Sequence, residues 1–420
     1  MAVPTKGVLV TIAEDYKPFE NDGMQEFYRR ARAEEPVFFC DELNCFVVTQ
    51  RDAVMSIFSD AETYSAVNSQ SPIREFSSRV SQILAEGGFT REPTQANTDP
   101  PKHTRIRAIS SGFLNAKQYA ALRDGIVSLT RESLEALKGK GRVDLVKEVT
   151  YELPAKVLFL LLGAPQSDAF KIKQWADNRF NMVWGVLDED SEVAAAYALV
   201  DYWNYCKDLV RDREKNPGND YASYLLEARR GDDAILSMNE IHSLIHGVML
   251  AGHETTTNAA GGLLLSLMEN PAQWQRLLND PTLIPNAVEE GLRYTPPLIT
   301  WRRKPRKDVC IGGVEIPAGS NILMSIVSAN RDETEFTDGE RFDVARENAR
   351  RHIAFGKGLH FCLGAQLAKL ELTILLEEIL NAYPSMSLIQ DQIIDWPYNM
   401  GFRGPRSVWV NLNEQITDHR

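Results

Sequence analysis

Apolar residues recur every three to four positions through most of the chain, which is the spacing of one face of an α-helix. The longest apolar stretch, 244–267, is interrupted by His246, His253, Glu254 and Asn258, so it predicts a buried helix and not a membrane span. The same periodicity predicts helices over 24–34, 53–58, 116–138, 146–162, 167–185, 192–214, 219–229, 239–270 and 285–294.

Alternation of apolar and polar residues, the mark of a strand, is confined to short segments. The segments 37–40 and 45–48 flank a polar turn and predict a hairpin, and 309–319 predicts a second one. Further strands are expected at 321–327, 386–389 and 408–412. The fold class is therefore mainly α with a minor β component. No linker, repeat or low-complexity segment divides residues 1–420, so we expect one domain.

Residues 60–98 are polar and show little periodicity. Because a loop of this length in a compact domain usually has a function, we expect it to cover a pocket. Asp99, Pro100 and Pro101 follow, and they predict a helix start with Asp99 as the N-cap and the prolines in the first turn.

Charge and cysteine content narrow the class of protein. The formal net charge is −12, from 46 basic and 58 acidic residues, which argues against general nucleic-acid binding. A local basic face for an acidic protein partner remains compatible with it. The five cysteines are widely spaced and form no CxxC pair, and residues 1–20 hold no apolar signal core. These features indicate a reduced, cytoplasmic location.

The segment Phe355–Gly364 is a glycine-rich loop that carries Cys362 and runs into a predicted helix over 363–382. The free N–H groups and partial positive charge at a helix start favour a thiolate. The glycines let the backbone bend and let a flat partner approach. With His360 as an anion donor, these groups suit an iron porphyrin with propionates. An ordinary buried thiol, or a thiol nucleophile with His360 as its base, stays open at this point.

The segment Ala251–Thr256 lies in the middle of the longest predicted helix, although Gly, His and consecutive Thr are weak helix formers. A carboxylate and a hydroxyl, Glu254 and Thr255, are costly in apolar surroundings unless they are used. Gly252 can open a local groove, and the Thr255 hydroxyl can bond back to a carbonyl or reach into a cavity. A solvated polar face with a packing glycine is the alternative.

The pattern Phe-Gly-x-Gly-x-His-x-Cys-x-Gly of Phe355–Gly364 closely resembles the heme-binding signature of the cytochrome P450 family in its bacterial form. Ala251–Thr256 resembles the oxygen-activation motif of that family. The resemblance covers nearly the whole chain and implies a triangular helical prism around a buried heme b (iron protoporphyrin IX) with Cys362 as the iron ligand. The segment Met400–Arg406 resembles a narrower group, which includes reductase-fused, self-sufficient members and members that cleave aryl ethers.

The resemblance also implies roles for other residues. Glu254 and Thr255 are the expected catalytic pair that supplies protons. Glu290, Arg293 and Arg346 are expected to form a structural clasp behind the heme. The expected cofactor-binding residues are His103, Arg107, Ala251, Gly252, Arg303, Phe355, Gly356, His360 and Gly364, with Arg302 as a competitor of Arg303. The expected substrate pocket holds Met249, Leu250, Ile299, Trp301 and Phe402, under a roof formed by 180–184.

The function implied is that of a monooxygenase that activates O2 to hydroxylate or O-dealkylate a small hydrophobic or aromatic substrate. The chain carries no flavin motif or dinucleotide fingerprint, so electrons from NAD(P)H must come through a ferredoxin-type, flavodoxin-type or fused reductase partner. We expect this partner to dock on a basic patch of Lys102, Arg105, Lys357 and Lys369. A peroxide-driven peroxygenase of the same fold, or a heme carrier or sensor, is the alternative; neither needs the pair Glu254 and Thr255.

Overall fold

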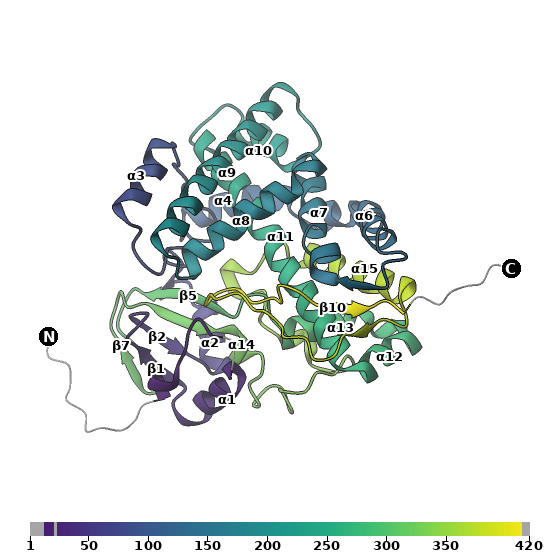
Figure 1. The fold of residues 1–420 in the computed structure, drawn as a ribbon. Coiled ribbons are helices and arrows are strands. Elements are labelled where there is room, and N and C mark those ends of the chain that lie inside the picture. Colours follow the sequence, from purple (N-terminus) through teal and green to yellow (C-terminus); the bar gives the residue numbers. More distant parts are fainter. Residues whose placement is uncertain (1–11, 21–22, 414–420) are drawn as a thin grey trace.

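The computed structural model describes residues 12–20 and 23–413, and it is built mainly from helices (Figure 1). In outline the molecule is roughly triangular, with most strands gathered at one corner and helix α11 crossing the middle. The helices of the first half are α1 (Met24–Glu34), α2 (Arg51–Ser59), α3 (Ser78–Glu86), α4 (Lys102–Phe113), α5 (Ala116–Ala121), α6 (Arg123–Glu135), α7 (Leu153–Leu162), α8 (Ala169–Trp184) and α9 (Glu189–Lys215). Those of the second half are α10 (Tyr221–Arg229), α11 (Met238–Glu269), α12 (Pro271–Asn279), α13 (Ile284–Tyr294), α14 (Ile326–Ala329) and α15 (Ala365–Ala382).

The strands form a minor component, as the alternation in the sequence predicts. One sheet has the order β1-β2-β8-β5-β3, in which β2 and β8 pair in parallel. Its strands are β1 (Val37–Cys40), β2 (Cys45–Val48), β3 (Tyr64–Ser65), β5 (Thr300–Pro305) and β8 (Ile322–Ser325). A second sheet joins β4 (Arg142–Asp144), β10 (Trp409–Asn411) and β9 (Ser387–Leu388), and β6 (Val309–Ile311) pairs with β7 (Val314–Ile316). Both predicted hairpins are therefore confirmed.

Most helices follow the sequence prediction, but α12 and α14 were not predicted and three other segments differ from it. The predicted helix 116–138 is divided at Leu122 into α5 and α6, and 146–162 begins with a π-helical turn over Val146–Thr150 before α7. The polar segment 60–98 contains α3, whose N-cap Ser77 accepts a hydrogen bond from the Val80 N–H. The pattern misses α3 because only one narrow face of this short helix is apolar.

The prediction of Asp99 as a helix N-cap is wrong. Helix α4 begins at Lys102, and its N-cap position is Pro101. The Asp99 carboxylate instead accepts hydrogen bonds from the Ser65 hydroxyl and the Ala66 N–H and pairs with Arg306. It therefore ties the segment after β3 to the end of β5.

Helix α11 passes through the centre of the molecule. It begins with a capping box, in which Ser237 and Glu240 exchange side-chain and backbone hydrogen bonds. Most of its side chains are buried, yet Ala251, halfway along it, is exposed. An exposed residue in the middle of a central helix indicates an internal cavity. None of the helices in the described part of the chain combines the length and the apolar character needed to cross a membrane.

Candidate active site

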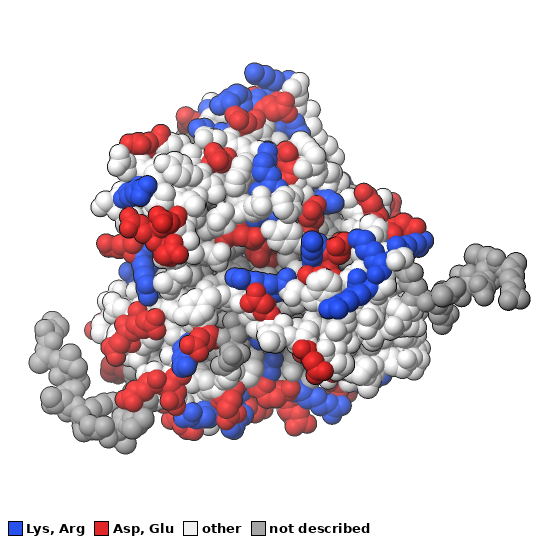
Figure 2. All heavy atoms as spheres, viewed as in Figure 1, with Lys and Arg blue, Asp and Glu red and all other residues white. Residues whose placement is uncertain are grey.

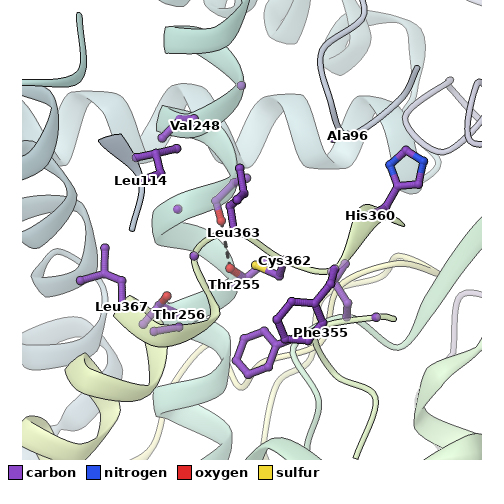
Figure 3. Close-up of a pocket in the computed structure, with 18 of the residues that line it drawn as sticks. Ala96, Leu114, Val248, Thr255, Thr256, Phe355, His360, Cys362, Leu363 and Leu367 are labelled. Atoms are coloured by element: carbon purple, nitrogen blue, oxygen red, sulfur yellow. Dashed lines mark hydrogen bonds between the residues drawn. The ribbon is translucent and has the colours of Figure 1, made fainter. Parts of the chain in front are cut away.

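The cavity lies between the middle of α11 and the loop that precedes α15. Figure 3 shows Thr255 and Thr256 on α11, with Phe355, His360, Cys362 and Leu363 on the loop. The segment 94–96 and the residues Gln70, Leu298 and Trp301 complete part of the wall. The long polar segment after α2 therefore covers a pocket, as its length predicts.

Cys362 lies three residues before Ala365, the first residue of α15. It is exposed to the cavity and lines it. Its N–H donates a hydrogen bond to the Phe355 carbonyl over 3.1 Å, which closes the loop. Burial raises the pKa of the Cys362 thiol, while the N–H groups of Gly364 and Ala365 and the charge of Arg107 lower it. Because burial is the largest of these effects, the helix start alone does not stabilise a thiolate here, whereas a bound metal cation would do so.

The loop glycines have two different functions. Gly356 and Gly358 adopt the left-handed backbone, with φ of 68° and 70°, which favours glycine. A Cβ on Gly358 would lie 2.6 Å from the Phe58 carbonyl oxygen at the end of α2, so no side chain fits there. Gly364 has an ordinary φ of −82°, but a Cβ on it would lie 3.9 Å from the Cys362 sulfur. Only Gly364 therefore keeps space beside the thiol.

Basic side chains with unused donors gather at one edge of the cavity. His103 is fully buried, neither of its ring nitrogens has a hydrogen-bond partner, and its ring centroid lies 4.4 Å from that of His360. His360 Nδ1 lies 3.0 Å from the Gln95 carbonyl oxygen, whereas its Nε2 has no partner. Arg107 donates to the Phe361 carbonyl over 2.6 Å, and Arg303 is 2% exposed. N–H donors of this kind are suited to binding an anion.

The two neighbouring arginines of β5 point to opposite sides of the strand. Arg303 lines the cavity with Trp301, two residues before it, and its guanidinium lies 5.4 Å from the Phe58 ring centroid. Arg302 lies 4.1 Å from the Trp184 ring centroid and donates to the Ser71 carbonyl. Since successive side chains of a strand alternate, Arg303 and not Arg302 reaches the edge of the cavity beside His360.

On α11, Thr255 and Ala251 lie on the cavity wall one turn apart. The Thr255 hydroxyl donates to the Ala251 carbonyl over 2.9 Å, as the sequence allowed. Gly252 also lines the cavity, but a Cβ on it would lie 2.8 Å from the Leu158 side chain of α7. The main reason for this glycine is the close approach of α7 to α11.

Glu254 lies on a different face of α11, and it does not line the cavity. Its carboxylate pairs with Lys173 of α8, which is fully buried and also donates to the Thr257 hydroxyl over 3.3 Å. Burial, together with the charge of Glu254, raises the pKa of the adjacent Asp177 to about 7. The Tyr151 hydroxyl donates to Asp177 over 2.8 Å. No local sequence pattern predicts this ionisable cluster, because its residues come from separate helices, α8 and α11.

The structure brings together the three residues of the expected clasp. Glu290 and Arg293 are fully buried, and Arg293 donates two hydrogen bonds to Glu290, over 2.7 and 2.8 Å. Arg346 donates to Glu290 over 3.1 Å and to the carbonyls of Thr337, Asp338 and Arg341. The clasp therefore fixes the irregular segment that leads to the cysteine loop.

Four of the five predicted pocket residues require correction. Trp301 lines the cavity, whereas Met249, Leu250, Ile299 and Phe402 do not. The residues of α11 on the wall are Leu244, Gly247, Val248, Ala251, Gly252, Thr255, Thr256 and Ala259, which follow one helix face, and Met249 and Leu250 are buried in the core beside that face. Ile299 packs against Val327, and Phe402 packs on Phe180, with ring centroids 4.2 Å apart.

Sequence reasoning missed several residues of the wall. Glu371 of α15 is 6% exposed and lines the cavity; burial raises the pKa of its carboxyl well above the usual range, and its Oε2 has no hydrogen-bond partner. The remaining missed residues include Gln70, Thr94, Leu114, Tyr119, Leu158, Leu161 and Leu292. Glu371 did not stand out in the sequence, because α15 also carries Lys369, Glu377 and Glu378.

The predicted basic patch is largely neutralised by carboxylates. Lys102 pairs with Glu92 and Glu240, and Arg105 pairs with Glu240 over 2.6 Å. Lys369 pairs with Glu289 over 2.9 Å. Of the four residues only Lys357 is exposed without an ion pair within the described part of the chain. Figure 2 likewise shows basic and acidic residues interspersed on the face in view.

The residues present fit an iron porphyrin with propionates. A thiol open to the cavity supplies a soft ligand, and the aromatic ring of Phe355 and apolar side chains of α11 and α15 supply a wall. Arg107, Arg303 and the unpartnered His360 Nε2 lie at one edge, and the unpartnered His103 packs behind His360 without lining the cavity. A carboxylate edge on a flat apolar group would satisfy these donors.

Comparisons with known proteins agree with this geometry. A family model described as Cytochrome P450 matches residues 46–400. The 6-deoxyerythronolide B hydroxylase of Saccharopolyspora erythraea is 32% identical over 385 residues, which are 90% of this chain and 92% of the relative.

Two solved structures are also similar. Cytochrome P450 CREJ in complex with (4-ethylphenyl) dihydrogen phosphate is 38% identical, with a TM-score of 0.92, and the match covers 95% of this chain and 99% of that chain. An intact type IV self-sufficient cytochrome P450 monooxygenase is 33% identical, with a TM-score of 0.90, and the match covers 95% of this chain and 53% of that chain.

Proposed function

Because the chain belongs to the cytochrome P450 family, we propose that it hydroxylates or O-dealkylates a small aromatic substrate. It is a cytochrome P450 monooxygenase, its cofactor is heme b, and its reaction takes O2 and electrons from a redox partner. We also propose that the chain forms one domain, since one hydrophobic cluster of the described residues extends from Ile12 to Leu412.

One observation carries the proposal: the Cys362 thiol and the Thr255 hydroxyl line the same cavity, from the loop and from α11. When bound, the heme supplies O2 activation through an iron held by a thiolate. Cys362 holds the iron, and His103, Arg107, Arg303 and His360 bind the propionates. Phe355 and Gly364 leave flat space beside the sulfur.

Thr255 holds a proton at its Oγ1, which is fixed by its hydrogen bond to the Ala251 carbonyl. Glu254 brings protons from the opposite side of α11, where it pairs with Lys173 beside Asp177. This role requires the Glu254 side chain to leave Lys173 and to turn toward the cavity during turnover. A buried carboxylate whose neighbour Asp177 has a pKa of about 7 suits proton transfer near neutral pH.

The aromatic class of the substrate is supported by the wall and by a relative. Trp301 and Phe355 line the cavity together with aliphatic side chains such as Leu244, Val248 and Leu298. The similar structure of cytochrome P450 CREJ holds a 4-ethylphenyl compound. O-Dealkylation as well as hydroxylation is included because both begin with the same attack on a C–H bond.

The electron donor we propose is a ferredoxin-type or flavodoxin-type protein or a fused reductase. The similar self-sufficient monooxygenase is nearly twice as long as the segment that matches this chain, since the match covers 53% of it. The exposed Lys357 lies in the loop that carries Cys362 and offers a cationic contact on that side.

The test is turnover of 4-alkylphenols and 4-alkoxyphenols by the heme-loaded protein with a ferredoxin, its reductase and NADPH. The proposal predicts hydroxylated or dealkylated phenols in the wild type. In Thr255→Ala, reductant consumption should continue while product falls and hydrogen peroxide rises. Thr257→Ala is the matched control, because Thr257 bonds to Lys173 and does not line the cavity, and it should stay coupled. Full coupling in Thr255→Ala would contradict the role of Thr255, and product formed with hydrogen peroxide but not with NADPH would favour a peroxygenase.

A further inference from the structure

Three arginines, two of them buried and one half-buried, lie near the cavity without a carboxylate partner. They are Arg91 in the segment before α4, Arg179 of α8 and Arg302 of β5. Arg179 and Arg302 are 9% and 8% exposed. Burial lowers the pKa of Arg91 to about 10, of Arg179 to about 9 and of Arg302 to about 10. Within the described residues no Asp or Glu forms an ion pair with any of them.

The three guanidinium groups belong to one cluster. The charges of both Arg91 and Arg302 lower the pKa of Arg179, which places Arg179 within electrostatic reach of the two. The charges of Arg91 and Arg179 in turn lower the pKa of His246 on α11, after the larger effect of burial. The cluster therefore lies where α8, α11 and the segment before α4 meet.

Arg91 contacts residues of the cavity wall directly, and Arg302 reaches the wall through Trp184. Arg91 Nη2 donates to the Gln70 side chain over 2.7 Å, and Gln70 lines the cavity. The same nitrogen lies 3.9 Å from the position of a Cβ on Gly247, another residue of the wall. The Arg302 guanidinium lies against Trp184, whose ring stacks on that of Trp301 with centroids 5.5 Å apart.

The cluster lies at the right distance from the reacting end of a small molecule. Gly247 precedes Thr255 by eight residues on α11, which corresponds to about 12 Å along the helix axis. One substituted benzene ring with a head group spans a comparable length. A substrate with its ring near Thr255 can therefore present its head group to the arginines.

Uncompensated burial of three like charges is unfavourable, so the cluster needs an explanation. A buried charge without a partner is among the most destabilising features of a protein interior. The Nε atoms of Arg91 and Arg302 are buried without any hydrogen-bond partner. Arg107 and Arg303 are cations too, so they cannot neutralise the cluster. They line the edge of the cavity that we assign to the heme propionates.

We propose that Arg91, Arg179 and Arg302 bind the phosphate of the substrate, so that the enzyme oxidises a small aromatic phosphate monoester. This inference rests on the proposed function and names the substrate class of the same site. A phosphate monoester carries a charge of about −1.5 to −2 near pH 7 and three acceptor oxygens. Guanidinium forks match phosphate oxygens in pairs, so three of them neutralise and orient this group better than a carboxylate.

The experiment is a titration of the ferric, heme-loaded protein with four matched compounds, read by the spin-state shift of the heme. They are 4-methoxyphenyl phosphate, 4-methoxyphenyl sulfate, 4-methoxybenzoate and 4-methoxyphenol. The phosphate should bind at least roughly tenfold more tightly than the phenol, which corresponds to one good charge-assisted hydrogen bond. Equal affinity for the phosphate and the phenol, or tighter binding of the benzoate or sulfate, would overturn the proposal.

Neutral variants locate the site. Arg179→Gln and Arg302→Gln should each weaken phosphate binding at least roughly tenfold and leave phenol binding unchanged. Arg131→Gln is the control, because Arg131 is an exposed arginine paired with Glu378 far from the cavity lining, and it should bind both as the wild type does. Each variant removes an uncompensated buried charge, so the fold should be retained, and circular dichroism checks this. Unchanged phosphate affinity in both variants would overturn the proposal.

The same samples distinguish failure of this inference from failure of the function. The reduced carbon monoxide difference spectrum and turnover of 4-methoxyphenol report the monooxygenase by itself. If both are normal while the phosphate has no advantage, only the phosphate site is wrong. If neither the band nor turnover is present in the wild type, the proposed function itself fails.

Discussion

Glu290→Gln tests how strongly the clasp holds the molecule together. The Glu290 carboxylate accepts two hydrogen bonds from Arg293, one from Arg346 and one from the Asp343 N–H, and it is fully buried. The amide keeps the shape of the side chain, but it removes the negative charge and replaces one acceptor oxygen with an NH2 donor that faces guanidinium donors. Breaking a buried ion pair by removal of one partner costs about 3–5 kcal/mol. Because two arginines lose their carboxylate at once, we expect the upper half of that range.

The assay is urea unfolding of the heme-loaded protein, with stability taken from the midpoint and the slope. Glu26→Gln is the matched control, because Glu26 pairs with Arg29 at the same three-residue spacing but on the surface of α1. The control should leave the midpoint unchanged. A Glu290→Gln midpoint within error of the Glu26→Gln midpoint would refute the reasoning that this clasp stabilises the fold.

Three further predictions follow from the site. Arg303→Gln should speed heme transfer to apomyoglobin while its neighbour Arg302→Gln does not, since only Arg303 lines the cavity; equal rates would contradict the propionate role. Burial, with the charge of Glu254, raises the pKa of Asp177 from 3.8 to about 7. The protonated Asp177 therefore contributes fully to the free energy of unfolding below pH 3.8, and this contribution is lost as the pH rises through about 7. Asp177→Asn should therefore flatten the decline of the thermal midpoint over this window, and an unchanged decline would count against the cluster. Lys357→Glu should slow reduction by a ferredoxin at low salt, whereas Lys102→Glu, whose lysine is already paired with Glu92 and Glu240, should not; equal effects would restore the wider basic patch.

The sequence predicted best what is local in the chain. The cysteine loop and α15 follow one another directly, and the capped, apolar α11 was found nearly to the residue, because caps and periodicity act within a few positions. The spacing of three residues places Glu290 and Arg293 on one face of α13, but their role in a clasp with Arg346 came from the family resemblance.

Some errors could have been avoided from spacing alone. Residues four apart share a helix face, so Thr255 and Ala251 on the wall imply that Met249 and Leu250 face elsewhere. Strand alternation likewise pairs Trp301 with Arg303, the arginine preferred to Arg302 in the sequence analysis. For Met249 and Leu250 the helix was predicted correctly, but the direction of the side chains was not considered.

Other features depend on contacts between distant segments. Arg105 meets Glu240, 135 residues later, and Lys173 meets Glu254, 81 residues later. The arginine cluster collects Arg91, Arg179 and Arg302 from three separate elements. No local pattern specifies such pairs, because only the packing of α4, α8, β5 and α11 brings them together.

The reduced carbon monoxide difference spectrum tests the central claim most directly, since it reports the atom that Cys362 gives to the iron. The wild type should show the red-shifted band of a thiolate-ligated heme, and Cys362→Ser should lose it while still binding heme. Variants of the other cysteines, Cys40, Cys45, Cys206 and Cys310, should keep the band, because none of them lines the cavity. A Cys362→Ser protein with an unchanged band would contradict the account.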